Sequence, residues 1–183
     1  AKWTFMAYLD ADIDLGSFAM NVLAAMAGAG STSDVNIIAL IDHSDPLTSS
    51  YPYTLQAGTW AYYVYKEGVA WLQGFGSSER NMGDPETLKS FVTYAKNKFP
   101  AERYALNTWD HGAGILGVCF DDSDYDWLEY DEIFRALNET GGVDLIYYFS
   151  CLTACLENFY TVSNVTKVAV ASEEVMYAAG DYY

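Results

Sequence analysis

The chain has 183 residues, of which 51% are hydrophobic, and this is enough to enclose one well-formed core. Its 25 acidic and 9 basic side chains give a formal net charge of −16, and a field of this sign repels nucleic acid and anionic membranes. Since no apolar run approaches the roughly 20 residues that cross a bilayer, we expect a single domain over residues 1–183 that binds no nucleic acid and has no membrane span.

Short apolar runs alternate with segments of helical period, which is typical of a mostly parallel sheet with helices on both faces. In chain order, the pattern predicts a strand at 3–12, a helix at 15–30, a strand at 35–44, a β-hairpin beside the main sheet at 54–75, a helix within 84–100, a strand at 103–112, a helix at 130–140, a strand at 143–151, a helix at 152–162 and a strand at 166–174. The expected fold class is therefore α/β.

Two predicted strands end in residues that can do chemistry. In open α/β sheets, ligands bind beyond the carboxyl ends of the strands, where Asp110, His111 and Gly112 end one strand and Cys151 ends the next. If these strands are neighbours, the imidazole and the thiol share one cleft. An imidazole beside a cysteine generates the nucleophilic thiolate and later protonates the leaving amine.

The position of Cys151 adds to this hypothesis. It precedes a predicted helix that begins at Leu152, and the N-terminus of a helix favours a thiolate. The N–H groups at that helix start, with those of Cys151 and Gly112, are candidate donors to the oxyanion of a tetrahedral intermediate. Free cysteines are also among the most buried residue types, so on spacing alone Cys151 as a packing residue remains open.

Several stretches resemble the clostripain-like family of cysteine peptidases, relatives of the caspases and gingipains. They are the first strand "WTFMAYLDAD", the helix and its approach "NMGDPETLKSFVTYAKNKFPAERYAL", the histidine motif "WDHGAG", the cysteine motif "VDLIYYFSCLTACLE", and the later "VAVASEE" and "GDYY". The resemblance implies a caspase-like three-layer sandwich in which His111 is the catalytic histidine and Cys151 the nucleophile. Glu157 aligns with a glutamate of the family's cysteine motif, and we expect it to have a structural role.

This sequence departs from the family pattern in the specificity pocket and in length. The family has an aspartate two residues before the cysteine, where it selects arginine or lysine, and Phe149 stands there; Ala179 aligns with a second acidic position. Desolvating a guanidinium without a partner is costly, so we expect an apolar or aromatic P1 residue. Family members also continue beyond "GDYY", so we expect their C-terminal strand and extensions to be missing, removed, or supplied by a second chain.

The acidic loop "DDSDYD" places Asp122, Asp124 and Asp126 at alternate positions, as a calcium loop does. It lacks the glycine and final glutamate of an EF-hand, so a solvated loop is the alternative, while the calcium dependence that the resemblance implies keeps a Ca²⁺ site open. The similar run from Asp10 to Asp14 is interpreted as a strand end and helix cap. We expect no cofactor in the chemistry itself.

The remaining histidine and cysteines receive structural interpretations. Three cysteines and two histidines form neither a disulfide framework nor a zinc motif. His43 lacks the glycine that follows His111, which makes it a poor candidate for the catalytic histidine. Cys155 is expected to face the core or to pair with Cys119.

The leading hypothesis is a secreted or cell-surface cysteine endopeptidase acting on peptides or proteins. Two glycosylation sequons, at Asn138 and Asn164, favour an exported protein. The alternative is a non-catalytic caspase-like module that serves as an extracellular structural or assembly protein, with self-assembly or a second chain as its partner. Strong acidity, 16 tyrosines and the altered pocket suit this alternative as well.

Overall fold

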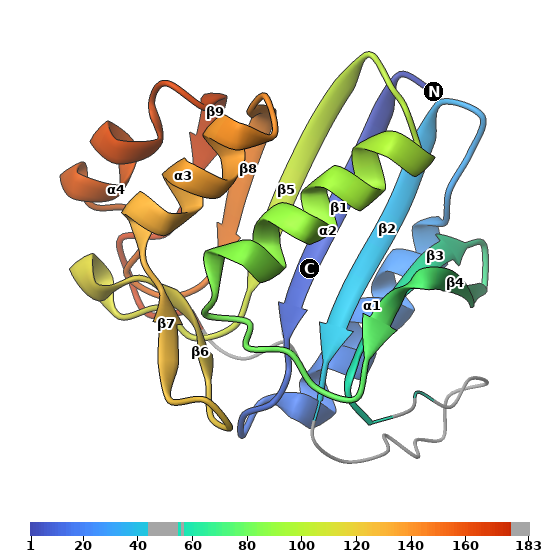
Figure 1. Cartoon of the computed structure of the whole chain (residues 1–183), viewed down its shortest axis with the longest axis horizontal. Coiled ribbons are helices and arrows are strands. Elements are labelled where there is room, and N and C mark those ends of the chain that lie inside the picture. Colours follow the sequence, from blue (N-terminus) through green and yellow to red (C-terminus); the bar gives the residue numbers. More distant parts are fainter. Residues whose placement is uncertain (44–54, 56, 177–183) are drawn as a thin grey trace.

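Five apolar runs of the sequence form parallel strands at the centre of the protein. The computed structural model describes residues 1–43, 55 and 57–176, and it places these strands in a seven-stranded sheet of order β4-β3-β2-β1-β5-β8-β9 (Figure 1). The bounds of the elements are β1 Trp3–Asp10, α1 Gly16–Ala29, β2 Val35–Asp42, β3 Thr59–Tyr65, β4 Gly68–Ser77, α2 Pro85–Lys98, β5 Arg103–Trp109, η1 Gly114–Leu116, β6 Val118–Asp121, β7 Asp126–Leu128, α3 Tyr130–Glu139, β8 Val143–Phe149, α4 Leu156–Val162 and β9 Thr166–Val170.

The order of the strands sets which of their ends lie side by side. β1 pairs in parallel with β2 and β5, and β5 pairs in parallel with β8. The histidine and cysteine strands are thus neighbours, which is the condition for a shared cleft. The predicted hairpin is also present, since β3 pairs antiparallel with both β2 and β4 and extends the same sheet.

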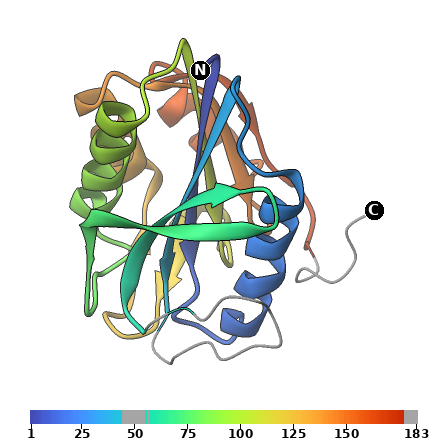
Figure 2. The same cartoon turned by 90° about the vertical axis from the view of Figure 1, so that its right-hand side faces the viewer.

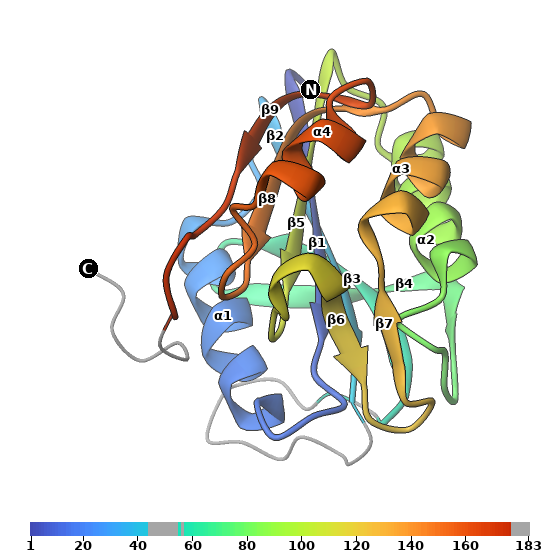
Figure 3. The ribbon, with the colours of Figure 1, turned by 90° about the vertical axis from the view of Figure 1, so that its left-hand side faces the viewer.

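Helices cover both faces of the sheet, which gives three layers. α2, α3 and α4 pack on one face through a core that includes Tyr8, Phe91, Ile133 and Ile146, all fully buried. α1 packs on the opposite face through a second core, to which Trp109 belongs. Figures 2 and 3 show α1 and α2 on opposite sides of the strands.

The capping signals of α2 act as the sequence predicts. The Asp84 carboxylate accepts a hydrogen bond from the N–H of Glu86 at 2.8 Å, and Pro85 occupies the first helical turn, where a missing N–H costs nothing. Lys96 and Lys98 stand in the last turn, where positive charge is favourable. Among the described residues, no helix is long and apolar enough to span a membrane.

One local prediction is wrong. The helix expected from Leu152 begins only at Leu156, because the preceding residues form a turn in which Leu152 has a positive φ of 57°. The acidic loop is present as the exposed turn of a short hairpin between β6 and β7, which the sequence pattern did not predict. This hairpin lies at the carboxyl end of the central strands (Figure 3).

Candidate active site

His111 projects from the loop that follows β5. The preceding residue, Asp110, is only 4% exposed, and its Oδ2 accepts a hydrogen bond from the N–H of Phe120 at 2.6 Å. This contact ties the loop to β6 and leaves the His111 side chain 47% exposed. The Nε2 of His111 lies 3.0 Å from Oδ1 of Asp14, in the loop between β1 and α1. One ring nitrogen is therefore held by a carboxylate.

Gly112 brings the histidine loop against the cysteine loop. A Cβ at this position would lie 2.3 Å from the carbonyl oxygen of Cys151 and 2.9 Å from Cγ2 of Thr153, closer than real Cβ atoms approach. Only glycine fits between the two loops without displacing backbone. The missing side chain of Gly112 therefore sets how closely the two loops approach each other.

Cys151 is half-buried and its sulfur contacts the backbone of Met176. The N–H of Met176 donates to Sγ at 3.2 Å, and the thiol donates to the carbonyl oxygen of Met176 at 3.3 Å. All three cysteines are free thiols, so the pairing considered for Cys155 and Cys119 does not occur. Cys155 packs against the core, and Cys119 is fully buried.

The turn after Cys151 replaces the predicted helix start. The N–H groups of Leu152 and Ala154 donate to the carbonyls of Glu174 and Ser172, and Nδ2 of Asn158 holds the carbonyl of Thr153. Cys151 therefore lies five residues before Leu156, the first residue of α4, and the expected stabilisation of its thiolate by a helix N-terminus does not apply. Because the N–H groups of Leu152 and Ala154 already donate to the segment at 172–174, they are not free to bind an oxyanion.

His111 and Cys151 line one small hollow of about 50 Å³. Its other walls are Leu15, Trp109, Asp110, Phe149, Ser150 and Met176. Trp109 and Phe149 also line a neighbouring apolar hollow of about 190 Å³ between α1 and the sheet. Phe149 thus lines the same hollow as Cys151, whereas Ala179 falls outside the described residues.

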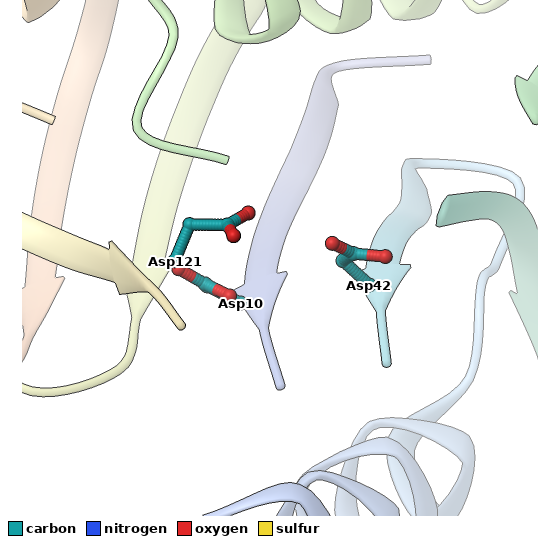
Figure 4. Close-up of side chains that lie close together, drawn as sticks. All are labelled: Asp10, Asp42 and Asp121. Atoms are coloured by element: carbon teal, nitrogen blue, oxygen red, sulfur yellow. The ribbon is translucent and has the colours of Figure 1, made fainter. Parts of the chain in front are cut away.

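A group of buried carboxylates lies close to this site. Oxygen atoms of Asp10, Asp42 and Asp121 fall within 4.8 Å of one another (Figure 4), and a second such group joins Asp121 to Asp12 and Glu79. Burial and the nearby carboxyl groups of Glu79 and Asp121, opposed by the hydrogen bond from Thr59, together raise the pKa of Asp42 to about 8. Burial and Asp110 likewise raise the pKa of Asp10 well above its ordinary value.

The residues proposed from sequence as calcium ligands lie elsewhere. Asp122 and Asp124 are exposed, and Oδ2 of Asp126 accepts a hydrogen bond from Nδ2 of Asn81 at 2.8 Å. None of the three belongs to a group of converging ligand atoms among the described residues. His43 is buried at the end of β2, and Glu157 is exposed in the first turn of α4.

Sequence reasoning missed Asp14, Met176 and the buried carboxylates. Asp10 and Asp42 are the last residues of two apolar strands, and in the sheet they are direct neighbours in register. A carboxylate that closes each of two adjacent apolar runs is the signal that could have found them. Asp14 contacts His111 and Met176 contacts Cys151 across long stretches of sequence, so no local pattern predicts these contacts.

A parallel α/β sandwich with a histidine and a cysteine at adjacent strand ends defines a caspase-like domain with a candidate thiol–imidazole site. Residues 7–183 match the model of the clostripain family, Peptidase C11, and the chain belongs to this family. It is 31% identical over 186 residues to clostripain from Hathewaya histolytica, which covers 87% of this chain and 35% of clostripain. The chain thus spans about a third of the length of that curated relative.

Solved structures of the same family share the fold. One is a secreted C11 cysteine protease from Bacteroides thetaiotaomicron in complex with an irreversible peptide inhibitor, with a TM-score of 0.79 and 20% identity over 96% of this chain and 50% of that chain. Another is an inactive zymogen C11 protease from Parabacteroides distasonis, with a TM-score of 0.75 and 19% identity over 97% of this chain and 50% of that chain. These likenesses confirm the predicted fold class.

Proposed function

We propose that the protein is a cysteine endopeptidase in which Cys151 is the nucleophile and His111 the general acid and base. The observation that carries the proposal is that the thiol and the imidazole line one hollow at the ends of adjacent strands. Membership of the clostripain family supports the same roles. The close fit of Gly112 against the carbonyl of Cys151 holds the two loops in a fixed relation.

The reaction follows from these two side chains. His111 removes the thiol proton, and the sulfur forms a bond to the scissile carbonyl carbon, which gives a tetrahedral oxyanion. The imidazolium then protonates the leaving amine as the C–N bond breaks, and a thioester remains on Cys151. Water, deprotonated by the same imidazole, attacks the thioester and releases the acid product and the free thiol.

The N–H groups of Cys151 and Gly112 are our candidates for the oxyanion donors. The N–H groups of Leu152 and Ala154 already donate to carbonyls of the segment at 172–174, so the donors must come from the two facing loops. Backbone N–H groups held in place before the reaction stabilise an oxyanion without reorganisation. The contact of Asp14 with Nε2 of His111 leaves the other ring nitrogen for the thiol.

We further propose that the enzyme accepts an apolar P1 side chain. Leu15, Trp109, Phe149 and Met176 supply apolar surface around the thiol. Asp110 is only 4% exposed, its Oδ2 already accepts a hydrogen bond from the N–H of Phe120, and burial raises the pKa of its carboxyl group well above the ordinary value. It therefore provides little negative charge to pair with an incoming guanidinium, and desolvating a guanidinium without a partner is costly.

Reporter peptides that differ only at P1 test both the activity and the specificity. We expect kcat/KM for Phe or Leu at P1 to exceed that for Arg at least tenfold. The variant Phe149→Asp restores a carboxylate beside the thiol and should raise the relative rate for Arg. A wild-type preference for Arg would refute the apolar pocket while leaving the thiol mechanism intact.

One contact favours a second candidate, a non-catalytic module. The backbone of Met176 occupies both hydrogen-bonding roles of the Cys151 thiol, so a substrate must displace that contact before the sulfur can react. A module of this kind cleaves no peptide in the reporter set, even after proteolytic processing. We also propose that the protein is secreted, as the Bacteroides thetaiotaomicron relative is described to be, and cell fractionation tests this location.

A further inference from the structure

The apolar hollow of about 190 Å³ between α1 and the sheet lies next to the hollow that Cys151 and His111 line. Trp109 and Phe149 are walls of both hollows. The other apolar walls of the larger hollow are Val22, Ala25 and Met26 of α1 and Phe5 of β1. A substrate bound at the thiol therefore has apolar space beside it.

Asn107 of β5 contributes a buried polar group to this apolar hollow. Its side chain belongs to a residue that is 4% exposed, and its Oδ1 finds no hydrogen-bond donor among the described residues. Asparagine is depleted in strands, and a buried polar atom without a partner destabilises the folded chain. Natural proteins break such rules chiefly at functional sites, so this oxygen is a candidate acceptor for a donor that a ligand supplies.

The register of the strands sets how far Asn107 lies from the thiol. Asn107 pairs with Tyr147, and both line the hollow. Trp109 and Phe149 form the next pair on the same face, two residues or about 7 Å closer to the strand ends. Cys151 follows Phe149 at that end. A side chain that enters from the thiol must therefore pass Trp109 and Phe149 and be long enough to place a polar tip at Oδ1.

The size and the walls of the hollow restrict what this side chain can be. Pockets for drug-sized ligands begin at about 300 Å³, so the hollow of about 190 Å³ suits one large side chain. Its apolar walls disfavour a charged group, because desolvation of a charge without a partner is costly. Tyrosine combines an apolar ring with a hydroxyl that donates a hydrogen bond from its far end.

We propose that this hollow binds the P1 side chain of the substrate and that Asn107 selects tyrosine there. The ring packs between α1 and the two shared walls, and the hydroxyl donates to Oδ1 of Asn107. Phenylalanine and leucine fill only the apolar part and leave this oxygen unpaired. A site with a buried hydrogen-bonding group rejects an analogue that lacks the partner group more strongly than an apolar pocket can. The inference rests on the proposed peptidase function, whose substrate class it names.

Reporter peptides that differ only at P1 test the selection. We expect kcat/KM for Tyr to exceed that for Phe by about tenfold or more. A peptide with O-methyltyrosine at P1 keeps the ring and the oxygen but lacks the donor, so its kcat/KM should fall to that of Phe or below. Equal values for Tyr and Phe, or for Tyr and O-methyltyrosine, would refute the hydrogen bond to Asn107.

The variant Asn107→Leu removes the acceptor and nearly keeps the shape of the side chain. The ratio of Tyr to Phe cleavage should fall to about one or below. Because the variant also removes a buried polar group without a partner, its Tm should equal or exceed that of the wild type. An unchanged ratio would contradict the proposal. A clear loss of stability would contradict it too, since it would show that Oδ1 has a partner within the chain.

The variant Thr108→Val is the matched control. Thr108 is the next residue of β5, is fully buried, and its Oγ1 also finds no partner among the described residues. Successive residues of a strand face opposite sides of the sheet, so Thr108 faces the same core as Leu106 and does not line the hollow. The ratio of Tyr to Phe cleavage should match that of the wild type. An equal fall of the ratio in both variants would assign the effect to the packing of β5 and refute the contact with substrate.

Small analogues of the side chains test the hollow without any peptidase activity. In NMR titrations of the Cys151→Ala protein, 4-methylphenol should shift the backbone amide signals of residues 105–109 and 147–149. It should bind more tightly than toluene by about fivefold or more, and Asn107→Leu should abolish this difference. Equal affinities for the two probes, or shifts confined to other segments, would refute the site.

The two assays separate this inference from the proposed function. If 4-methylphenol binds as expected and no peptide is cleaved, the peptidase function is wrong while the hollow and its acceptor stand. If peptides are cleaved without a preference for Tyr at P1, the role of Asn107 is wrong while the peptidase function stands.

Discussion

Replacing Gly112 with alanine perturbs the candidate site at a single point. The new methyl group would lie 2.3 Å from the carbonyl oxygen of Cys151, whereas ordinary contacts begin at 3.4 Å, so the two loops must separate by about 1 Å. A misplacement of about 1 Å at a reacting centre costs about 100-fold in rate. This corresponds to about 2.7 kcal/mol in the activation barrier.

The effect of Gly112→Ala should appear in kcat and in kcat/KM together, because the separation acts on the transition state more than on substrate binding. The matched control is Gly28→Ala, since a Cβ at Gly28 meets no atom within 4 Å and alanine is favoured over glycine inside a helix. The control should keep wild-type rates and gain slight stability. If Gly112→Ala folds with a normal Tm and stays within about threefold of the wild-type rate, the argument from loop contact is wrong.

Three further predictions concern specificity, packing and capping. Phe149→Asp should raise the ratio of Arg to Leu cleavage at P1 at least tenfold, and an unchanged ratio would remove Phe149 from the pocket. Phe91→Ala should lower the free energy of unfolding by about 3 to 5 kcal/mol in urea titrations, because Phe91 is fully buried against Tyr8 and Phe75. A loss below about 1 kcal/mol would contradict this packing. Asp84→Ala should lower the free energy of unfolding by about 1 kcal/mol through loss of the cap on Glu86, and Asp84→Asn, which keeps a cap, should lose much less.

Much of the fold could be predicted because its signals are local. The apolar runs that become β1, β2 and β5 are buried on both faces over most of their length, so each is recognisable without knowledge of its partners. The Asp84–Pro85 start of α2 also depends only on adjacent residues. Since chemistry in such sheets lies at the strand ends, the positions of His111 and Cys151 followed from the strands.

The details that the sequence did not predict depend on contacts between distant segments. The segment 150–155 has residues that suit a helix, but the carbonyls of Ser172 and Glu174 take the N–H groups of Ala154 and Leu152 and hold a turn. The buried carboxylates meet only because β6 returns to the ends of β1 and β2, which no spacing along the chain reveals. The same holds for Met176 on the thiol.

The rate at which the Cys151 thiol is labelled shows whether Cys151 is an activated nucleophile. The protein is treated with iodoacetamide under native conditions, and peptide mass spectrometry follows Cys151, Cys155 and Cys119 separately. Cys155 is the internal control, since it is half-buried like Cys151 but does not line the hollow that His111 lines. We predict that Cys151 reacts at least tenfold faster than Cys155, that His111→Ala abolishes this difference, and that the buried Cys119 does not react. Equal rates at Cys151 and Cys155, or a rate at Cys151 that His111→Ala leaves unchanged, would contradict the proposed active site.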